Sequence, residues 1–180
     1  MKHSYKIEGI ILGRRNFGEG DRVITVLSKK RGKILLLAKG VRKVSSKRGP
    51  HIEVFNIILG QAFLGKAWDI LGEATAIESF PNLRQNLSRI GAAYEMSEIV
   101  NKFLPEEENN LAIFNLLKTN LRQLDNTNYI NLNNFLWSFK VHLLNLTGFW
   151  PKKKEIDHHQ ADQYIEAITQ SKIKSKKMRI

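Results

Sequence analysis

The sequence predicts an α+β protein in which a small five-stranded β-barrel precedes an α-helical domain. In residues 4–78, short runs of β-forming residues are separated by glycine-containing turns, whereas after Phe80 the apolar residues recur every three or four positions. Charge divides at the same place: residues 1–80 carry 15 Lys and Arg against 7 Asp and Glu, while residues 81–151 carry 6 of each. We therefore expect residues 1–80 to form a basic barrel domain and residues 81–180 a helical domain with a basic C-terminal tail.

Five strands are predicted: three short ones, and two longer ones that follow a long polar loop. They cover residues 5–13, 23–27, 34–38, 52–64 and 68–77. Glycine-containing turns at residues 18–21, 29–32 and 65–66 separate neighbouring runs, and residues 39–50 form the loop. Five strands in about 75 residues suit the OB-fold, the best-known barrel of this size that binds nucleic acid. An SH3-like barrel fits the same pattern nearly as well.

Three apolar stripes predict the helices. The first helix is expected to begin at a Ser79 cap with Pro81 in its first turn, and to stop at Leu104 and Pro105. The second stripe runs from Leu111 to Leu124, and the third runs from Leu132 to Leu146 and ends near Gly148. A last helix is expected at residues 160–169. Such stripes are typical of a helix-bundle core rather than of a cofactor site. The first stripe contains Leu83, Leu87, Ile90, Tyr94, Ile99, Val100 and Phe103.

Composition excludes several kinds of chemistry. The chain has no cysteine, which removes disulfides, thiolate zinc sites, iron–sulfur clusters and cysteine nucleophiles. No phosphate-binding loop, dinucleotide fingerprint or His-Glu-x-x-His motif is present. We expect no cofactor, no resident metal and no catalytic residue, and hence a binding protein rather than an enzyme. No signal peptide or membrane span is recognisable, so a cytoplasmic location is expected.

The basic half of the chain points to a polyanionic partner. Between Arg22 and Ile52 there are ten Lys and Arg but no Asp or Glu, and such a stretch repels itself unless an anion screens it. Aromatic side chains lie among these cations. Phe17 and Trp68, next to turns, are candidates for stacking on bases, whereas Phe55 and Phe63 are expected in the barrel core. The basic run at residues 172–179 is weaker evidence. The predicted phosphate contacts are Arg14, Arg15, Arg22, Lys29, Lys30, Arg31, Lys33, Lys39, Arg42, Lys43, Lys47 and Arg48.

Short motifs, in order and at matching spacing, resemble the bacterial recombination mediator family RecO over about residues 5–151. The motifs are Glu-Gly-Ile-Ile-Leu at 8–12, Phe-Gly-Glu-Gly-Asp-Arg at 17–22, Gly-Lys at 32–33, Ala-Lys-Gly-Val-Arg at 38–42, Glu-Ser-Phe-Pro-Asn-Leu-Arg at 78–84, and Leu-Leu-Asn-Leu-Thr-Gly-Phe-Trp-Pro at 143–151. The resemblance implies an OB-fold followed by a helical domain. It also implies binding of single- and double-stranded DNA, annealing of complementary strands, and help for RecA in displacing the single-stranded DNA-binding protein (SSB).

The same resemblance implies the partners RecR and the C-terminal tail of SSB, with RecA engaged indirectly near the nucleoid and no membrane partner. Two departures qualify it. Many RecO proteins carry a four-cysteine zinc site where this sequence has Lys-Lys-Lys-Glu-Ile-Asp-His-His at 152–159, and the chain is short for the family, so helices of the C-terminal domain are expected to be missing.

Two alternatives stay open. An RNA- or ribosome-associated OB-fold protein would need the same basic barrel. A metal-dependent nuclease would have to use the only candidate metal cluster, Asp157, His158, His159 and Asp162, which is more typical of a solvated loop.

Overall fold

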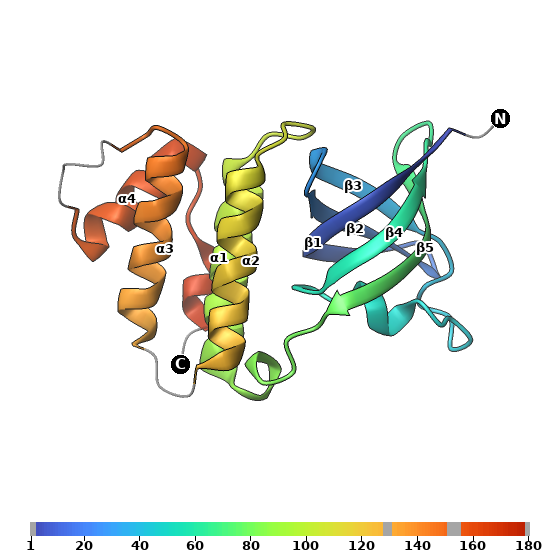
Figure 1. The fold of residues 1–180 in the computed structure, drawn as a ribbon, viewed down its shortest axis with the longest axis horizontal. Helices are drawn as coiled ribbons and strands as arrows, with labels where there is room; N and C mark the ends of the chain where they lie inside the picture. Colours follow the sequence, from blue (N-terminus) through green and yellow to red (C-terminus); the bar gives the residue numbers. More distant parts are fainter. Residues whose placement is uncertain (1–2, 128–130, 151–155, 179–180) are drawn as a thin grey trace. The chain divides into compact units, whose positions relative to one another are not determined.

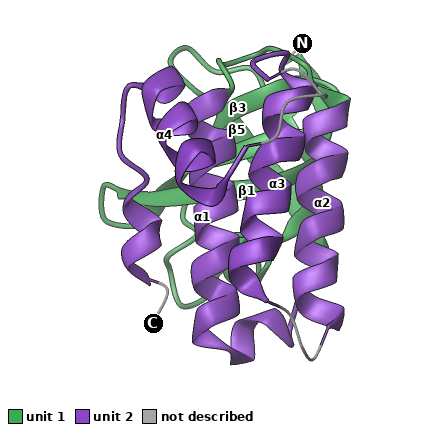
Figure 2. Ribbon diagram, turned by 90° about the vertical axis from the view of Figure 1, so that its left-hand side faces the viewer, with its two compact units in different colours: residues 1–79, 104–111 green, residues 80–103, 112–180 purple. Residues whose placement is uncertain are grey.

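The computed structural model describes residues 3–127, 131–150 and 156–178 of the 180-residue chain. The chain forms two compact units, coloured separately in Figure 2. Unit 1 comprises Met1–Ser79 together with Leu104–Leu111, and unit 2 comprises Phe80–Phe103 and Ala112–Ile180. The predicted α+β class is confirmed, since the first unit is built of strands and the second of helices.

Unit 1 is a closed β-barrel (Figure 1). Its strands are β1 (Ser4–Phe17), β2 (Asp21–Ser28), β3 (Gly32–Ala38), β4 (Ile57–Phe63) and β5 (Asp69–Glu78). They follow one another around the barrel in the order β1-β2-β3-β5-β4, with β4 pairing back onto β1. Only the short β3–β5 contact is parallel; the other pairs are antiparallel. The predicted OB-fold is confirmed, and the SH3-like alternative is set aside.

Strand β1 closes the barrel because it pairs with two neighbours. Its first part pairs with β4 from Ser4 to Ile10, and its second part with β2 from Gly9 to Phe17. The register shifts between Ile11 and Gly13, and such a bulge lets the strand bend from one neighbour to the other. Alternate strand residues point inward and form a continuous apolar core that includes Ile7, Ile24, Val26, Leu36, Ile58 and Leu71.

The loop after β3 differs from the prediction. The predicted strand at residues 52–64 begins only at Ile57. Gly49–Ile52 form a 3-10 helix instead, with Pro50 in its first turn. Ile52 is fully buried in the barrel core, so an apolar residue that resembles the start of a strand instead fills the barrel from a loop. Phe55 is buried as predicted, but outside that core cluster, and Phe63 is only half-buried.

Unit 2 contains the helices α1 (Leu87–Phe103), α2 (Leu111–Asn126), α3 (Leu132–Leu146) and α4 (His158–Thr169). The predicted start of the first helix was wrong. Phe80 has a left-handed backbone with φ 53°, residues Leu83–Gln85 form a 3-10 helix, and α1 begins only at Leu87. Gly148, with φ 75°, follows the end of α3 as predicted.

The predicted apolar stripes are confirmed over most of α2 and α3, but Leu111 and Leu146 at their ends are exposed, and the stripe is wrong at the start of α1. Leu87 is 73% exposed, whereas Glu95 is fully buried. The Nζ of Lys140, itself buried on α3, lies 2.5 Å from Glu95 Oε1 and 2.5 Å from Asp162 Oδ1 of α4. A buried ion triad therefore links three helices of unit 2. The stripe residues that are buried in α2 and α3 are Phe114, Leu117, Leu121, Leu124, Phe135, Leu136, Phe139 and Leu143.

The basic segment near the C-terminus packs on α1. Lys174–Met178 form a 3-10 helix whose first backbone N–H groups, those of Lys174 and Ser175, donate to the Glu98 carboxylate at 3.0 and 2.8 Å. Ile173 and Ser175 are buried. This part of the tail thus belongs to the folded helical unit. In the part of the chain that the structure describes, no helix is long and apolar enough to cross a membrane.

Candidate nucleic-acid interface

Backbone contacts join the β1–β2 turn to the long loop that follows β3. The Asp21 Oδ1 accepts a hydrogen bond from the Gly40 N–H at 2.7 Å, and the Arg42 N–H donates to the Gly20 carbonyl at 2.9 Å. The Arg42 guanidinium adds a bond to the Gly18 carbonyl at 3.1 Å. Gly18 and Gly40 both have positive φ, which glycine adopts without steric cost. The sequence alone did not indicate this tether, which holds two cation-bearing loops together.

Phe17 and Trp68 form an aromatic pair at this end of the barrel. Their ring centroids lie 5.1 Å apart at an interplanar angle of 89°, an edge-to-face contact between the end of β1 and the β4–β5 connection. The Arg15 guanidinium lies over the Trp68 ring, 5.2 Å from its centroid. Phe17 remains 42% exposed. In OB-folds the β1–β2 and β4–β5 loops bind oligonucleotides, and the Phe17–Trp68 pair joins the corresponding two segments of this barrel.

Two arginines, Arg14 and Arg22, share the carboxylate of Glu53. Arg14 forms an ion pair with it, and the Arg22 Nη1 lies 3.7 Å from its Oε1. Burial lowers the pKa of the Arg22 guanidinium, and the charges of Arg14 and Arg42 lower it further, against the opposing effect of Glu53. The single negative charge of Glu53 does not balance the positive charges of Arg14 and Arg22. A bound phosphate would reduce the repulsion between these guanidinium groups.

We call this region the β1–β2 end of the barrel. It is defined by seven of the predicted contacts and the two aromatic residues: Arg14, Arg15, Phe17, Arg22, Lys39, Arg42, Lys43, Lys47 and Trp68.

Arg48, another predicted contact, has its guanidinium bound to the backbone. It donates to the carbonyls of Leu71 at 2.9 Å, Gly72 at 2.8 Å and Lys39 at 2.5 Å. A guanidinium that satisfies three carbonyls holds the loop onto β5 and is less available to phosphate. We therefore leave Arg48 out of the proposed interface.

The remaining four predicted contacts lie at the opposite end of β2. Strand β2 has eight residues, and at about 3.3 Å per residue it separates the two ends by roughly 23 Å. We call the second region the β2–β3 end. The Lys29 Nζ lies 2.9 Å from a Glu8 carboxylate oxygen, and the Arg31 guanidinium lies over the Tyr5 ring, 4.1 Å from its centroid. The region is defined by Lys29, Lys30, Arg31 and Lys33.

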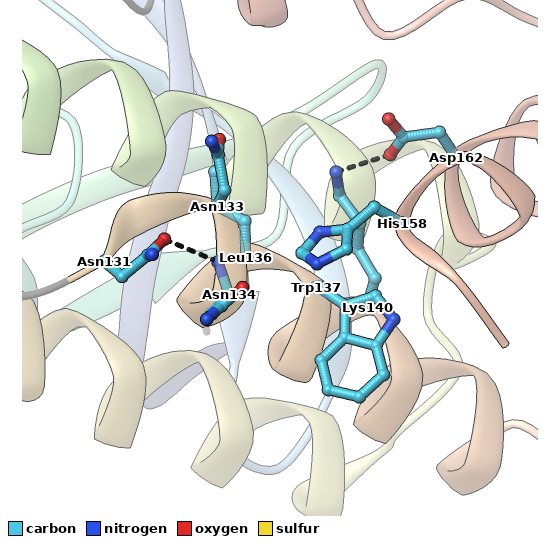
Figure 3. A pocket seen from close by; sticks show the side chains of 8 residues that line it. All are labelled: Asn131, Asn133, Asn134, Leu136, Trp137, Lys140, His158 and Asp162. Atoms are coloured by element: carbon cyan, nitrogen blue, oxygen red, sulfur yellow. Dashed lines mark hydrogen bonds and ion pairs between the residues drawn. The ribbon is translucent and has the colours of Figure 1, made fainter. Parts of the chain in front are cut away.

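Unit 2 holds a separate cavity of about 360 Å³ between α3 and α4 (Figure 3). Its lining includes Trp137, Lys140, His158 and Asp162. The Lys140 ammonium is already matched by Glu95 and Asp162, so it does not offer a free cation to an anionic ligand. Burial opposes ionisation of Asp162, but hydrogen bonds from Lys140 and Lys176 lower its pKa overall.

The residues of the candidate metal cluster serve the fold of unit 2. The Asp157 carboxylate caps the N-terminus of α4 by accepting from the Gln160 N–H at 2.8 Å, and Asp162 pairs with two lysines. Among the described residues, no three His, Asp or Glu side chains gather as metal ligands. Lys152–Lys154, at the start of the segment compared above with a zinc site, lie outside the described residues.

Comparison with known proteins gives the same family over both units. The model "Recombination protein O N terminal" matches residues 1–80, and the model "Recombination protein O C terminal" matches residues 84–154. The chain is 37% identical over 153 residues to the DNA repair protein RecO of Dehalococcoides mccartyi, an alignment that covers 85% of this chain and 60% of that protein. It is 34% identical over 151 residues to the DNA repair protein RecO of a Roseiflexus species, covering 84% of this chain and 52% of that protein.

The chain therefore spans between about half and three fifths of the length of these curated relatives. Both matched segments occur in the expected order, with the first over the barrel and the second over the helices. The chain belongs to the RecO family.

Proposed function

We propose that this protein is a non-catalytic DNA-binding factor of recombination and repair, and that it holds single strands at the β1–β2 end of its barrel. The observation that carries the proposal is the Phe17–Trp68 pair with the Arg15 guanidinium on Trp68, at the end of the barrel that also holds Arg14 and Arg22. Cations that follow the phosphates and aromatic faces that stack on bases are the two requirements for binding single strands without sequence preference. The relatives' name, DNA repair protein RecO, supports the same role.

Annealing of complementary strands follows from the charge without any covalent step. Two nucleic acid strands repel each other, and a surface with seven cations within reach of the two joined loops lowers that repulsion. The same surface accommodates double-stranded DNA through its phosphates. We propose that annealing and assistance to RecA on SSB-coated DNA are the steps that this protein performs in the cytoplasm, near the nucleoid.

An annealing assay tests the proposal directly. Two complementary strands, one coated with the cognate SSB, are mixed with the protein, and duplex formation is followed by fluorescence energy transfer. The proposal predicts acceleration that is lost when Lys39, Arg42 and Lys43 are all changed to Glu. Equal rates with and without protein contradict it. Competition between single-stranded DNA and structured RNA separates this function from that of an RNA-binding OB-fold protein, which would prefer the RNA.

For the helical unit, we propose docking of the acidic, apolar C-terminal tail of SSB in a groove between helices, and we propose RecR as the second protein partner. Family membership supports both partners. Titration of a labelled tail peptide, followed by fluorescence anisotropy, is expected to show saturable binding. A tail peptide without its terminal carboxylate and acidic residues provides the control, and no saturation with either peptide contradicts the proposal.

A further inference from the structure

The acidic segment Glu106–Glu108, which connects α1 and α2 in the sequence, lies against the β2–β3 end of the barrel. Leu104–Leu111 belong to unit 1, although the helices that flank them belong largely to unit 2. The Glu107 N–H donates to the Lys33 carbonyl at 2.9 Å, and Glu106 forms a parallel β-bridge with Lys33. The segment is therefore fixed to the barrel by backbone hydrogen bonding, next to four of the cations that the sequence predicts as phosphate contacts.

Gly32 makes this close approach possible. Its φ is 67°, and a Cβ built on it would lie 2.0 Å from the carbonyl oxygen of Glu108. Any other residue would collide with the backbone of the acidic segment as well as strain its own. The turn between β2 and β3 is thus shaped to receive this segment.

The carboxylates also act on the cations and their neighbours. Burial lowers the pKa of the Lys33 ammonium, and the charge of Glu106 opposes that shift. The Tyr5 hydroxyl donates to Asp69 at 2.5 Å beneath Arg31, and burial together with Asp69 and Glu107 raises the pKa of this phenol.

Charge is consequently balanced at one end of the barrel and unbalanced at the other. At the β2–β3 end, Lys29 pairs with Glu8, Glu106 acts on Lys33, and Asp69 and Glu107 act on Tyr5 beneath Arg31. In segments 14–22 and 39–56, which carry the seven cations of the β1–β2 end, the acidic residues are Glu19, Asp21 and Glu53. The phosphates of a nucleic acid are therefore attracted to the β1–β2 end, whereas the β2–β3 end offers them no net electrostatic attraction.

The acidic segment reaches Trp68. Glu106 and Glu107 line a cavity of about 160 Å³ together with Lys33, Trp68 and Asp69. Trp68 thus contacts Arg15 and Phe17 and also borders a cavity lined by carboxyl-bearing residues. A strand stacked on Trp68 meets negative charge if it continues toward the β2–β3 end.

We propose that the carboxylates of Glu106–Glu108 stand where a nucleic acid backbone would otherwise lie, and so confine a bound strand to the β1–β2 end of the barrel. The inference rests on the proposed DNA binding and adds a specificity element to it. The segment limits the number of phosphates that each barrel contacts and ends the binding path at Trp68.

The test compares the 180-residue protein with a variant in which Glu106, Glu107 and Glu108 are all Gln, using a short oligothymidylate as the probe. Because these side chains are exposed, the variant is expected to keep its fold, which circular dichroism verifies. We expect affinity at low salt to rise about 10-fold, and the slope of log K against log salt to steepen by about 2 as two or three more phosphates are contacted.

A second pair of variants separates local unmasking from the general effect of net charge. Lys30→Glu is expected to change affinity less than 2-fold in the wild-type background, and to remove most of the gain in the triple Gln background. Equal effects of Lys30→Glu in both backgrounds, or an unchanged affinity and slope in the triple variant, would overturn the inference while leaving the proposed function intact. Binding by the triple variant alone, or no binding by either protein, would overturn both the proposed function and the inference that rests on it.

Discussion

The rings of Phe17 and Trp68 meet edge to face, with their centroids 5.1 Å apart, although the two residues come from opposite ends of the barrel sequence. The contact joins the β1–β2 turn to the β4–β5 connection, and Arg15 covers the indole. It is a compact unit of two aromatic faces and one guanidinium, with cations on the neighbouring loop. Each element of this unit makes a separate contribution to binding that can be measured.

Removal of the indole is expected to weaken binding of single strands. Base stacking on an aromatic side chain contributes about 1–3 kcal/mol, so Trp68→Ala is expected to lower the affinity for oligothymidylate by roughly 10-fold or more. Fluorescence anisotropy of a labelled oligonucleotide measures the change. Phe149→Ala, at a half-exposed aromatic residue of unit 2, is the control and is expected to leave the affinity unchanged. An equal loss in both variants would argue against stacking at Trp68.

Charge reversal in the loop after β3 is expected to abolish binding. Lys39, Arg42 and Lys43 lie in one exposed stretch that is tethered to the β1–β2 turn, and changing all three to Glu replaces attraction by repulsion. The barrel core is not touched, so the melting temperature is expected to shift little. Lys30→Glu, an exposed lysine at the β2–β3 end, is the matched control. Its affinity is expected to stay close to that of wild type, and a loss as large as that of the triple variant would contradict the assignment of the interface.

Glu98 is expected to make the helical unit sensitive to acid. Burial alone would raise the pKa of this carboxyl, but hydrogen bonds from Lys102, Ser175 and the N–H of Lys174 lower it to about 2. A carboxyl whose pKa is lowered in the folded state stabilises the fold at pH values above 4.5, its pKa in the unfolded chain. That contribution is lost as the pH falls toward 2. Urea unfolding is expected to show a loss on the order of 2 kcal/mol between pH 5 and pH 2 that is reduced in Glu98→Gln. The same loss in both proteins would exclude this origin.

Removal of the lysine from the ion triad of unit 2 is expected to lower the free energy of unfolding. Lys140→Met leaves Glu95 fully buried without its ammonium, and breaking a buried pair in this way costs about 3–5 kcal/mol. The double variant Glu95→Gln with Lys140→Met is expected to recover part of this loss, because no buried charge then remains on α1. Chemical unfolding of both variants gives the two free energies. A loss below about 1 kcal/mol for Lys140→Met would show that the pair contributes little to stability.

The barrel was predictable because its signals are local. Alternation of apolar residues marks strands, and glycines mark turns, so β2, β3 and β5 lie close to their expected positions. Ile52 was wrongly predicted to begin a strand. It lies in a 3-10 helix that packs into the barrel core, and its sequence neighbours do not indicate this tertiary contact. Likewise, the exposure of Leu87 and the burial of Glu95 depend on which sides of α1 other helices cover.

The candidate site was predictable in its residues but not in its arrangement. The position of Phe17 and Trp68 beside turns favoured exposure, whereas their contact depends on how β1 and β5 are placed around the barrel. Ten of the twelve predicted cations formed one group in the sequence because Arg22 to Ile52 contains no acid. The structure divides that group, since Glu106–Glu108 reach one end from a distant part of the chain.

The dependence of single-strand affinity on salt shows whether the cations at the β1–β2 end bind phosphates. If about six of the cations at the β1–β2 end neutralise phosphates, log K for oligothymidylate is expected to fall linearly with log salt, with a slope of about −4. The measurement needs only the intact protein, a labelled oligonucleotide and a salt series. A slope near −4 that becomes shallower in the Lys39, Arg42 and Lys43 triple variant is the result that the account predicts. A slope near zero would contradict it, because binding would then not depend on phosphate contacts.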